Sequence, residues 1–147
     1  EIPRVANPSA AVRDALRSPI GGQPLRALAA DRAPRSVCIT MSDITRPVPN
    51  ELLITAILEE LNAVGVADAA CTLLIATGMH RPSTERERRI MLGDDLLRRL
   101  RVVDHEADKL DMQVRVSDDP PVSVNRLYAD AHLKIVTGLI EPHFKAG

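Results

Sequence analysis

The sequence predicts an α/β domain with a mainly parallel, Rossmann-like sheet, helices on both faces and a β-hairpin at the sheet edge. Apolar runs of strand length alternate with helical patterns along the chain, as in βαβ units. The runs are mainly apolar, which is typical of parallel strands buried on both faces. The chain has 147 residues, of which 45% are hydrophobic, enough for one core. We therefore expect residues 1–147 to form a single domain.

The N-terminal segment, rich in Pro, Ala and Arg, predicts two short helices. Asn7 suits the N-cap of a helix over Pro8–Leu16, because its side-chain oxygen can accept a hydrogen bond from the first turn and a proline follows it. A pair of glycines then interrupts the chain before a weaker helix over Pro24–Ala30.

Three apolar runs predict the inner strands of the sheet: Ser36–Met41, Ala70–Ala76 and Leu133–Ile140. Arg101–His105 predicts a further strand. We expect each parallel connection between them to be right-handed.

Two longer helices lie between these strands. Asn50 is expected to cap a helix that runs to Leu61, with apolar residues at helical spacing. Ser83 is expected to open a charged helix that runs to Leu92. Arg86 stands three positions later, where a capping box requires Glu, so no box is expected.

Period-two alternation in Met112–Val116 and Val122–Val124, around a proline-rich turn, predicts the hairpin. A helical turn is expected over Leu127–Ala131.

Composition excludes several classes of function. The formal charge of −1 argues against a nucleic-acid or anionic-membrane partner. No apolar stretch reaches the ~20 residues of a transmembrane helix, and no leader pattern opens the chain. Cys38 and Cys71 each lie within an apolar run, as expected of buried, reduced thiols, so a cytoplasmic protein is predicted. The chain has no pair of His or Cys at zinc-ligand spacing, no GxGxxG or P-loop motif and no GxSxG elbow.

Polar side chains gather where the predicted strands end. Asp43, Thr45 and Arg46 follow the first strand, His80 the second and His143 the last. Ligands of open α/β sheets bind at the carboxyl ends of the strands, so these residues are the candidate site. Each has a simpler reading: Asp43 as a turn residue, Arg46 as a surface charge, and the two histidines as loop residues. The other two histidines, His105 and His132, are expected to be structural or exposed.

Three blocks at these strand ends resemble the lactate racemase family: residues 42–50 (SDITRPVPN), 76–84 (ATGMHRPST) and 138–147 (GLIEPHFKAG). Their order and their positions after strands make the resemblance specific, and the similarity extends from about residue 8 to Gly147.

The resemblance implies an enzyme with a second, C-terminal domain and a nickel-bearing pincer nucleotide tethered through a lysine. Such enzymes racemise or epimerise a 2-hydroxy acid by moving a hydride. His80 and His143 match the two acid–base histidines, and Arg46 matches the arginine near the substrate carboxylate. Asp43 and Thr45 match polar positions that orient these groups or the cofactor.

The tether lysine and a nickel-ligating histidine are expected beyond Gly147, because Lys145 lies inside the third block and does not match the tether. The chain by itself is therefore expected to be inactive. Two other functions stay open: a domain that binds a small anion or nucleotide without catalysis, and an accessory domain that docks another chain. The sequence does not indicate which 2-hydroxy acid is used or the oligomeric state.

Overall fold

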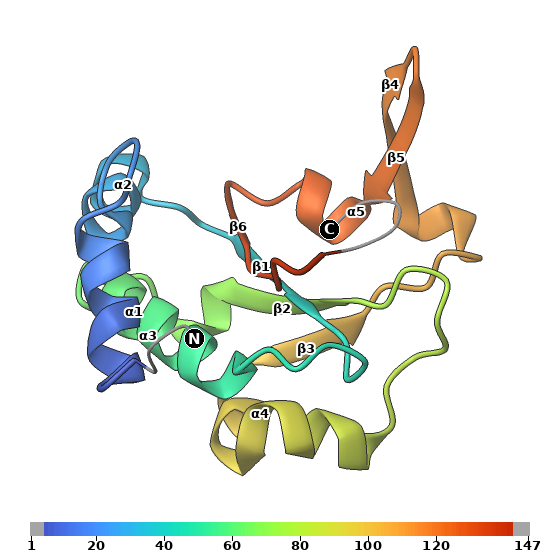
Figure 1. Cartoon of the computed structure of the whole chain (residues 1–147). Coiled ribbons are helices and arrows are strands. Elements are labelled where there is room, and N and C mark those ends of the chain that lie inside the picture. Colours follow the sequence, from blue (N-terminus) through green and yellow to red (C-terminus); the bar gives the residue numbers. More distant parts are fainter. Residues whose placement is uncertain (1–4, 143–147) are drawn as a thin grey trace.

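The computed structural model describes residues 5–142 and is built around a four-stranded parallel sheet (Figure 1). The strand order is β3-β2-β1-β6. The bounds of these strands are β1 Val37–Ser42, β2 Cys71–Ala76, β3 Arg101–Asp104 and β6 Leu133–Val136. Two further strands, β4 Gln113–Asp118 and β5 Pro121–Asn125, form an antiparallel hairpin that projects from the body (Figure 1). The predicted fold class is confirmed.

In the described part of the chain, five α-helices and two short 3₁₀ turns connect or flank the strands. The helices are α1 Pro8–Arg17, α2 Leu25–Arg32, α3 Asn50–Asn62, α4 Glu85–Arg99 and α5 Arg126–Ala129; the turns are η1 Asp68–Ala70 and η2 Leu110–Met112. Asn7 caps α1 as predicted, since its side chain accepts a hydrogen bond from Ala10 N at 3.0 Å.

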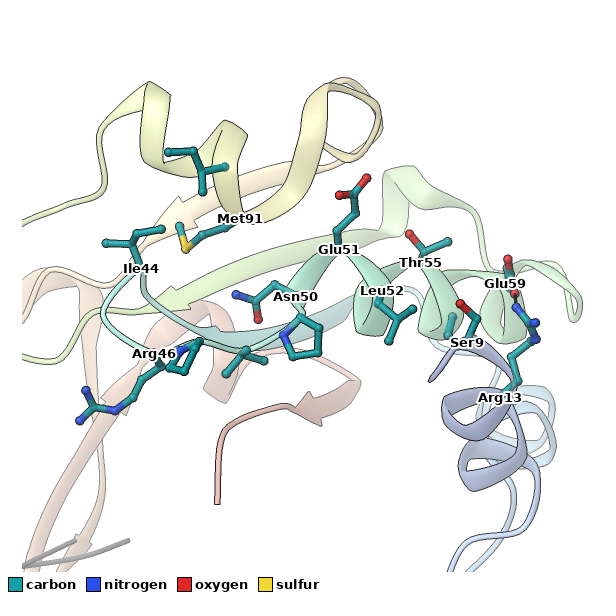
Figure 2. Close-up of a pocket in the computed structure, with 15 residues that line it drawn as sticks. Ser9, Arg13, Ile44, Arg46, Asn50, Glu51, Leu52, Thr55, Glu59 and Met91 are labelled. Carbon is teal, nitrogen blue, oxygen red and sulfur yellow. Dashed lines mark ion pairs between the residues drawn. The ribbon is translucent and has the colours of Figure 1, made fainter. Parts of the chain in front are cut away.

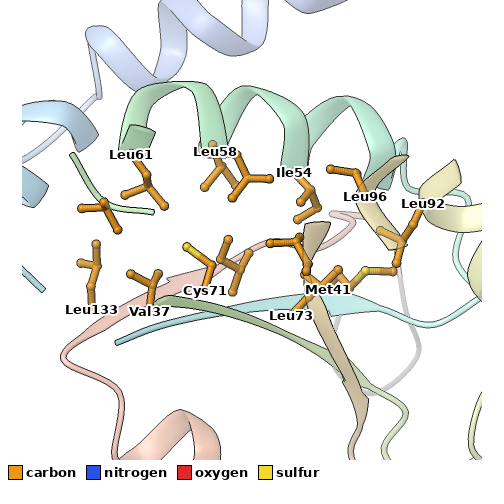
Figure 3. Packing of buried hydrophobic residues seen from close by; sticks show 14 of the residues in the cluster. Val37, Met41, Ile54, Leu58, Leu61, Cys71, Leu73, Leu92, Leu96 and Leu133 are labelled. Carbon is orange, nitrogen blue, oxygen red and sulfur yellow. The ribbon is translucent and has the colours of Figure 1, made fainter. Parts of the chain in front are cut away.

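The main core lies on one face of the sheet, here called the α3 face. Alternate strand residues project onto it, and α3 and α4 cover them (Figure 3). Among its best-buried members are Ile39, Met41, Leu73 and Ile75 from the sheet, Ile54, Leu58 and Leu61 from α3, and Leu92 and Leu96 from α4. The opposite face, the α5 face, carries a smaller cluster in which Cys38 and Leu74 pack against Ala131 and Tyr128. Helices therefore lie on both faces of the sheet, and they bury more of the α3 face than of the α5 face.

A buried carboxylate joins α1 and α2 to α3. Glu60 is 0% exposed. Its Oε1 accepts a hydrogen bond from Arg17 Nε at 2.9 Å and its Oε2 accepts one from Arg26 Nε at 3.0 Å. A carboxylate removed from water needs such partners, and the two arginines supply one for each oxygen.

Two expectations about the sheet were wrong in placement. Leu133–Ile140 was expected as an inner strand, but β6 ends at Val136 and lies at the edge of the described sheet, parallel to β1. An inner strand is buried on both faces, whereas β6 is buried on one face only. Leu133 is buried, and Lys134 and Val136 are exposed on the opposite face. The hairpin was expected at the sheet edge, yet β4 and β5 form a sheet of their own.

Two helix starts also differ from expectation. Pro49 is the N-cap of α3, so Asn50 occupies the first helical position and does not cap. Helix α4 begins one residue later than expected, with Thr84 as N-cap and Glu87 completing a capping box. The expectation of no capping box was wrong, because it took Ser83 as the N-cap, and Arg86 rather than Glu87 stands three positions after Ser83. Gly93, at φ 69°, interrupts α4 near its middle.

Candidate functional site

The loops that follow β1, β2 and β6 meet at one edge of the sheet. All three strands are parallel, so their carboxyl ends lie at the same side, as the sequence predicts. Side-chain contacts join the loops: Asp43 of the first contacts His80 of the second, and Arg46 of the first pairs with Glu141 of the third. The three motif blocks thus converge in space.

Asp43 is the centre of this cluster. It is 7% exposed, and its Oδ1 accepts hydrogen bonds from Thr45 N at 3.1 Å and Thr45 Oγ1 at 2.5 Å. Burial raises the pKa of Asp43, but the hydrogen bonds from Thr45 and His80 outweigh it and hold the pKa below its usual value. Asp43 is therefore a carboxylate, and both of its oxygens have partners within the chain.

His80 presents one ring nitrogen to Asp43. Nδ1 lies 2.6 Å from Asp43 Oδ2, and the side chain is 56% exposed. A carboxylate beside Nδ1 favours the tautomer that carries its proton there, which leaves the Nε2 lone pair available. Among residues 5–142, no hydrogen bond engages Nε2. The arrangement is that of a histidine prepared to accept a proton at Nε2.

The loop that carries His80 is anchored along its length. Thr77 donates to the carbonyl of His105, and Ser83 N donates to Asp104 Oδ1 at 3.0 Å. Arg81 makes a two-pronged contact with Glu87, at 2.9 Å from Nη1 and 2.7 Å from Nη2. These contacts place the loop against α4 and β3 and limit where His80 can lie.

Glu87 accepts further hydrogen bonds at the start of α4. Its Oε2 takes the N–H of Thr84 at 2.8 Å in addition to Arg81. The contacts with Arg81 lower the pKa of Glu87 to about 2, with the Thr84 bonds adding to the effect. The carboxylate therefore couples the helix cap to the loop.

Arg46 lies beside this cluster. Its Nε is 3.2 Å from Glu141 Oε1, and both side chains are partly exposed. Surface pairs of this kind contribute about 0–1 kcal/mol, so another anion can replace the carboxylate of Glu141. His143, predicted as the second histidine, lies outside the described residues.

Two hollows flank the loop that follows β1. The smaller, of about 290 Å³, is lined by Asp43, Ile44, Thr45, His80, Arg81, Ser83 and Glu87. The larger is a groove of about 650 Å³ that runs along α3 between α1 and α4, with Arg46 at one end and the Arg13–Glu59 pair at the other (Figure 2). His80 and Arg46 thus line adjacent hollows rather than one.

Three carboxylates of the site were not among the residues that the sequence predicted: Glu87, Asp104 and Glu141. Glu141 stands in the third motif block, so its position was a usable signal. Glu87 stands three residues after Thr84, so the capping-box pattern that begins at Thr84 was a usable local signal. Asp104 carries no such signal, because its partners are set by how α4 and β3 pack.

The remaining histidines have structural partners, as expected. His105 Nδ1 lies 3.2 Å from Asn125 Nδ2, and His132 Nδ1 accepts a hydrogen bond from Arg35 N at 3.2 Å. Both cysteines are buried, free thiols, and burial raises the pKa of each to about 11. Across residues 5–142, no three His, Cys, Asp or Glu side chains are grouped to hold a metal ion. In the same range no helix has the length and apolar character to cross a membrane.

Comparison with known proteins identifies relatives along the whole chain. The family described as the lactate racemase N-terminal domain matches residues 1–147. The lactate racemase of Lactiplantibacillus plantarum is 36% identical over 139 residues, which cover 92% of this chain and 32% of that protein. The lactate racemase of Thermoanaerobacterium thermosaccharolyticum is 33% identical over the same shares. This chain therefore spans about a third of the length of these relatives.

Solved structures agree with the relationship that the sequence comparisons show. The lactate racemase apoprotein of Thermoanaerobacterium thermosaccharolyticum superimposes with a TM-score of 0.86 at 31% identity, covering 94% of this chain and 33% of that one. A protein from Thermotoga maritima shares the fold, with a TM-score of 0.63 at 20% identity. The motif blocks, the sheet and these matches lead to one conclusion: the chain belongs to the lactate racemase N-terminal domain family.

Proposed function

We propose that the protein containing this chain is a racemase or epimerase of a 2-hydroxy acid, lactate or a close relative, and that this domain supplies its acid–base groups. The observation that carries the proposal is the Asp43–His80 pair at the carboxyl edge of the sheet. It occurs in a family whose named relatives are lactate racemases.

His80 is proposed to take the hydroxyl proton of the substrate at Nε2. Asp43 holds the Nδ1 proton at 2.6 Å and stays ionised because Thr45 and His80 lower its pKa. When Nε2 receives a proton the ring becomes a cation, and the adjacent carboxylate stabilises it. To form the opposite isomer, a proton must return to the substrate oxygen. His143 is proposed as the group that donates it.

Arg46 is proposed to bind the substrate carboxylate. A guanidinium matches a carboxylate in two parallel hydrogen bonds, and the existing contact with Glu141 is a partly exposed pair that a substrate can displace. Arg46 would then fix the orientation of the hydroxyl-bearing carbon relative to His80.

A nickel pincer nucleotide is proposed as the cofactor, and when bound it would supply the hydride acceptor. The donor set at this edge, with the Arg46 guanidinium beside Thr45, fits an anionic nucleotide. The described residues hold no metal-ligand cluster, so nickel ligands would come from elsewhere in the protein. Thr45 bonds to Asp43, and Asp43 bonds to His80, which favours a role of the two residues in positioning His80 over direct contact with the cofactor.

The test is to express the complete protein with the proteins that synthesise the cofactor and to follow isomer interconversion over a panel of 2-hydroxy acids. His80→Ala and His143→Ala should each lower kcat by about 10²–10⁴-fold, because general acid–base assistance is lost. Arg46→Ala should chiefly raise KM.

His132→Ala is the matched control, because the ring's one hydrogen bond among the described residues is accepted from the backbone N–H of Arg35, and the substitution should leave activity unchanged. Full activity of the His80→Ala/His143→Ala double variant would overturn the mechanism. Binding of the acids without turnover by the loaded protein would favour the non-catalytic anion-binding domain instead.

A further inference from the structure

The loop that carries His80, residues 77–83, is attached at both ends to two consecutive residues at the end of β3. At its start, the hydroxyl of Thr77 donates to the carbonyl of His105. At its end, the backbone N–H of Ser83 donates to Oδ1 of Asp104 at 3.0 Å. His80 therefore lies in the middle of a segment whose two ends are fixed to neighbouring points of the chain.

Asp104 is a carboxylate at a buried position. It is the last residue of β3 and lies on the same face of the sheet as Val102, which packs against the main core. Its side chain is 3% exposed. Oδ1 accepts the hydrogen bond from Ser83, and Oδ2 pairs with Nη2 of Arg88 from α4. The carboxylate thus joins β3 to both the loop and the helix.

Net stability alone does not account for a charge at this position. The free energy that is lost when two charges leave water can exceed what their pairing returns, and apolar side chains of similar volume are often as stable. Nε of Arg88 is also buried without a hydrogen-bond partner among residues 5–142. A carboxylate can, however, accept a hydrogen bond from a backbone N–H, which an apolar side chain cannot, and its charge strengthens that bond.

The position of the His80 ring depends on the backbone of its own loop. The ring is 56% exposed, so packing restrains it little. Its partner Asp43 belongs to a different loop and is held there by Thr45. The separation of 2.6 Å between Nδ1 of His80 and Oδ2 of Asp43 therefore requires that the two loops keep their relative positions.

We propose that Asp104 is a positioning residue for His80: by holding the backbone of Ser83, it keeps Nδ1 of His80 within hydrogen-bond distance of Asp43. The effect on turnover rests on the proposed function, in which His80 is an acid–base group, whereas the effect on the ring itself does not. A displacement of about 1 Å at a reacting group can lower a rate by about 100-fold, so a contact remote from the substrate can change kcat.

The first measurement is the tautomer of His80 in the complete protein, read from the ring ¹⁵N shifts at a pH at which the ring is neutral. This readout needs no cofactor, and the signal is assigned by its loss in His80→Ala. In the unmodified protein the proton should lie on Nδ1, which faces Asp43. Asp104→Leu fills the position with an apolar side chain but removes the acceptor for Ser83, so a population with the proton on Nε2 should appear.

The second measurement is turnover by the complete, cofactor-loaded protein. Asp104→Leu should lower kcat by about 100-fold. KM should stay within about threefold, because Arg46, which is proposed to bind the substrate carboxylate, belongs to the loop after β1. Asp104→Asn keeps an uncharged and weaker acceptor for Ser83. It should lower kcat by only about 3–10-fold and show a minor Nε2 population.

Asp68→Leu is the matched control, because Asp68 joins the other end of α4 to the body of the domain. Its Oδ2 accepts a hydrogen bond from Nε of Arg99 at 2.8 Å. Whatever its effect on Tm, this substitution should leave the His80 tautomer unchanged and kcat within about twofold. Changes as large as those in Asp104→Leu would overturn the proposal, since any loosening of α4 would then be sufficient.

An unchanged tautomer in Asp104→Leu would also overturn the proposal, whether or not kcat falls. If Asp104→Leu does not fold, Asp104→Asn decides, and wild-type values of its tautomer and kcat would overturn the proposal. Absence of turnover in the unmodified, loaded protein would count against the proposed function instead, and the tautomer of His80 would still test the role of Asp104.

Discussion

Nδ1 of His80 lies 2.6 Å from Oδ2 of Asp43, although 37 residues separate them in the sequence. The first comes from the loop after β2 and the second from the end of β1, and the parallel pairing of Ser42 with Ala76 brings these loops together. The contact fixes the tautomer of His80 and so decides which nitrogen faces the substrate in the proposed reaction.

Asp43→Asn should lower kcat of the complete, cofactor-loaded protein by about 100-fold or more. The two donors of Thr45 hold the side-chain oxygen, so the amide nitrogen faces His80 and donates to Nδ1. The proton of His80 then moves to Nε2, which can no longer accept one. Thr45→Val is the control: it removes one hydrogen bond to the carboxylate, and a smaller loss is expected. A kcat for Asp43→Asn within about threefold of the wild type would exclude the proposed role of the pair.

Glu87 should contribute to acid stability, and Glu87→Gln should remove that contribution. The folded-state pKa of about 2 lies below the ordinary value of 4.5, so the stabilisation is complete above pH 4.5 and is lost as the pH falls toward 2. The Tm difference between wild type and Glu87→Gln should therefore narrow over this range. Glu85→Gln is the control, because that side chain is 84% exposed and, within residues 5–142, pairs only with Arg89. A Tm difference that is constant with pH would contradict the expectation.

Glu60→Ala should lower the free energy of unfolding of the domain by about 2–4 kcal/mol, measured by denaturant titration of the complete protein. Both carboxylate oxygens are buried and bonded to arginines of α1 and α2, so the substitution removes both ion pairs that join these helices to α3. Glu59→Ala changes the neighbouring residue, whose contact with Arg13 is 3.6 Å long and partly exposed, and should cost less than about 0.5 kcal/mol. If both variants lost the same free energy of unfolding, burial of Glu60 would not be the source of its stabilising effect.

Gly93→Ala and Gly65→Ala should each destabilise the domain by about 1–2 kcal/mol. Both glycines have positive φ, 69° and 83°, which an alanine adopts only with strain. A Cβ on Gly93 would also come within 2.8 Å of Glu51 Oε1, but that atom is the end of a flexible side chain and can move. Adding Glu51→Ala to Gly93→Ala should therefore recover little stability in a thermal unfolding experiment. A full recovery would assign the loss to the contact with Glu51.

The sequence alone was sufficient for features that depend on neighbours along the chain. Alternation of apolar runs with helical patterns predicted β1, β2, β3 and the main helices, and the cap at Asn7 was predicted from its own residue type. Strand ends also predicted where Asp43 and His80 would lie, because parallel strands bring their carboxyl ends to one edge. Contact between these two side chains is in keeping with that expectation.

Tertiary structure alone decided which surfaces meet. Lys134 interrupts the apolar run of β6 but does not specify the neighbour of this strand, and only strand order places it beside β1. The hairpin pattern likewise does not specify whether its strands join the parallel sheet. Asp104 is an ordinary surface-type residue in sequence, and its role comes from partners fixed by packing. The ion pairs of Glu87 with Arg81 and of Glu141 with Arg46 likewise depend on how the loops fold. The physical reason is range: periodicity and capping act within a few residues, whereas strand order and ion pairing depend on the free energy of the whole fold.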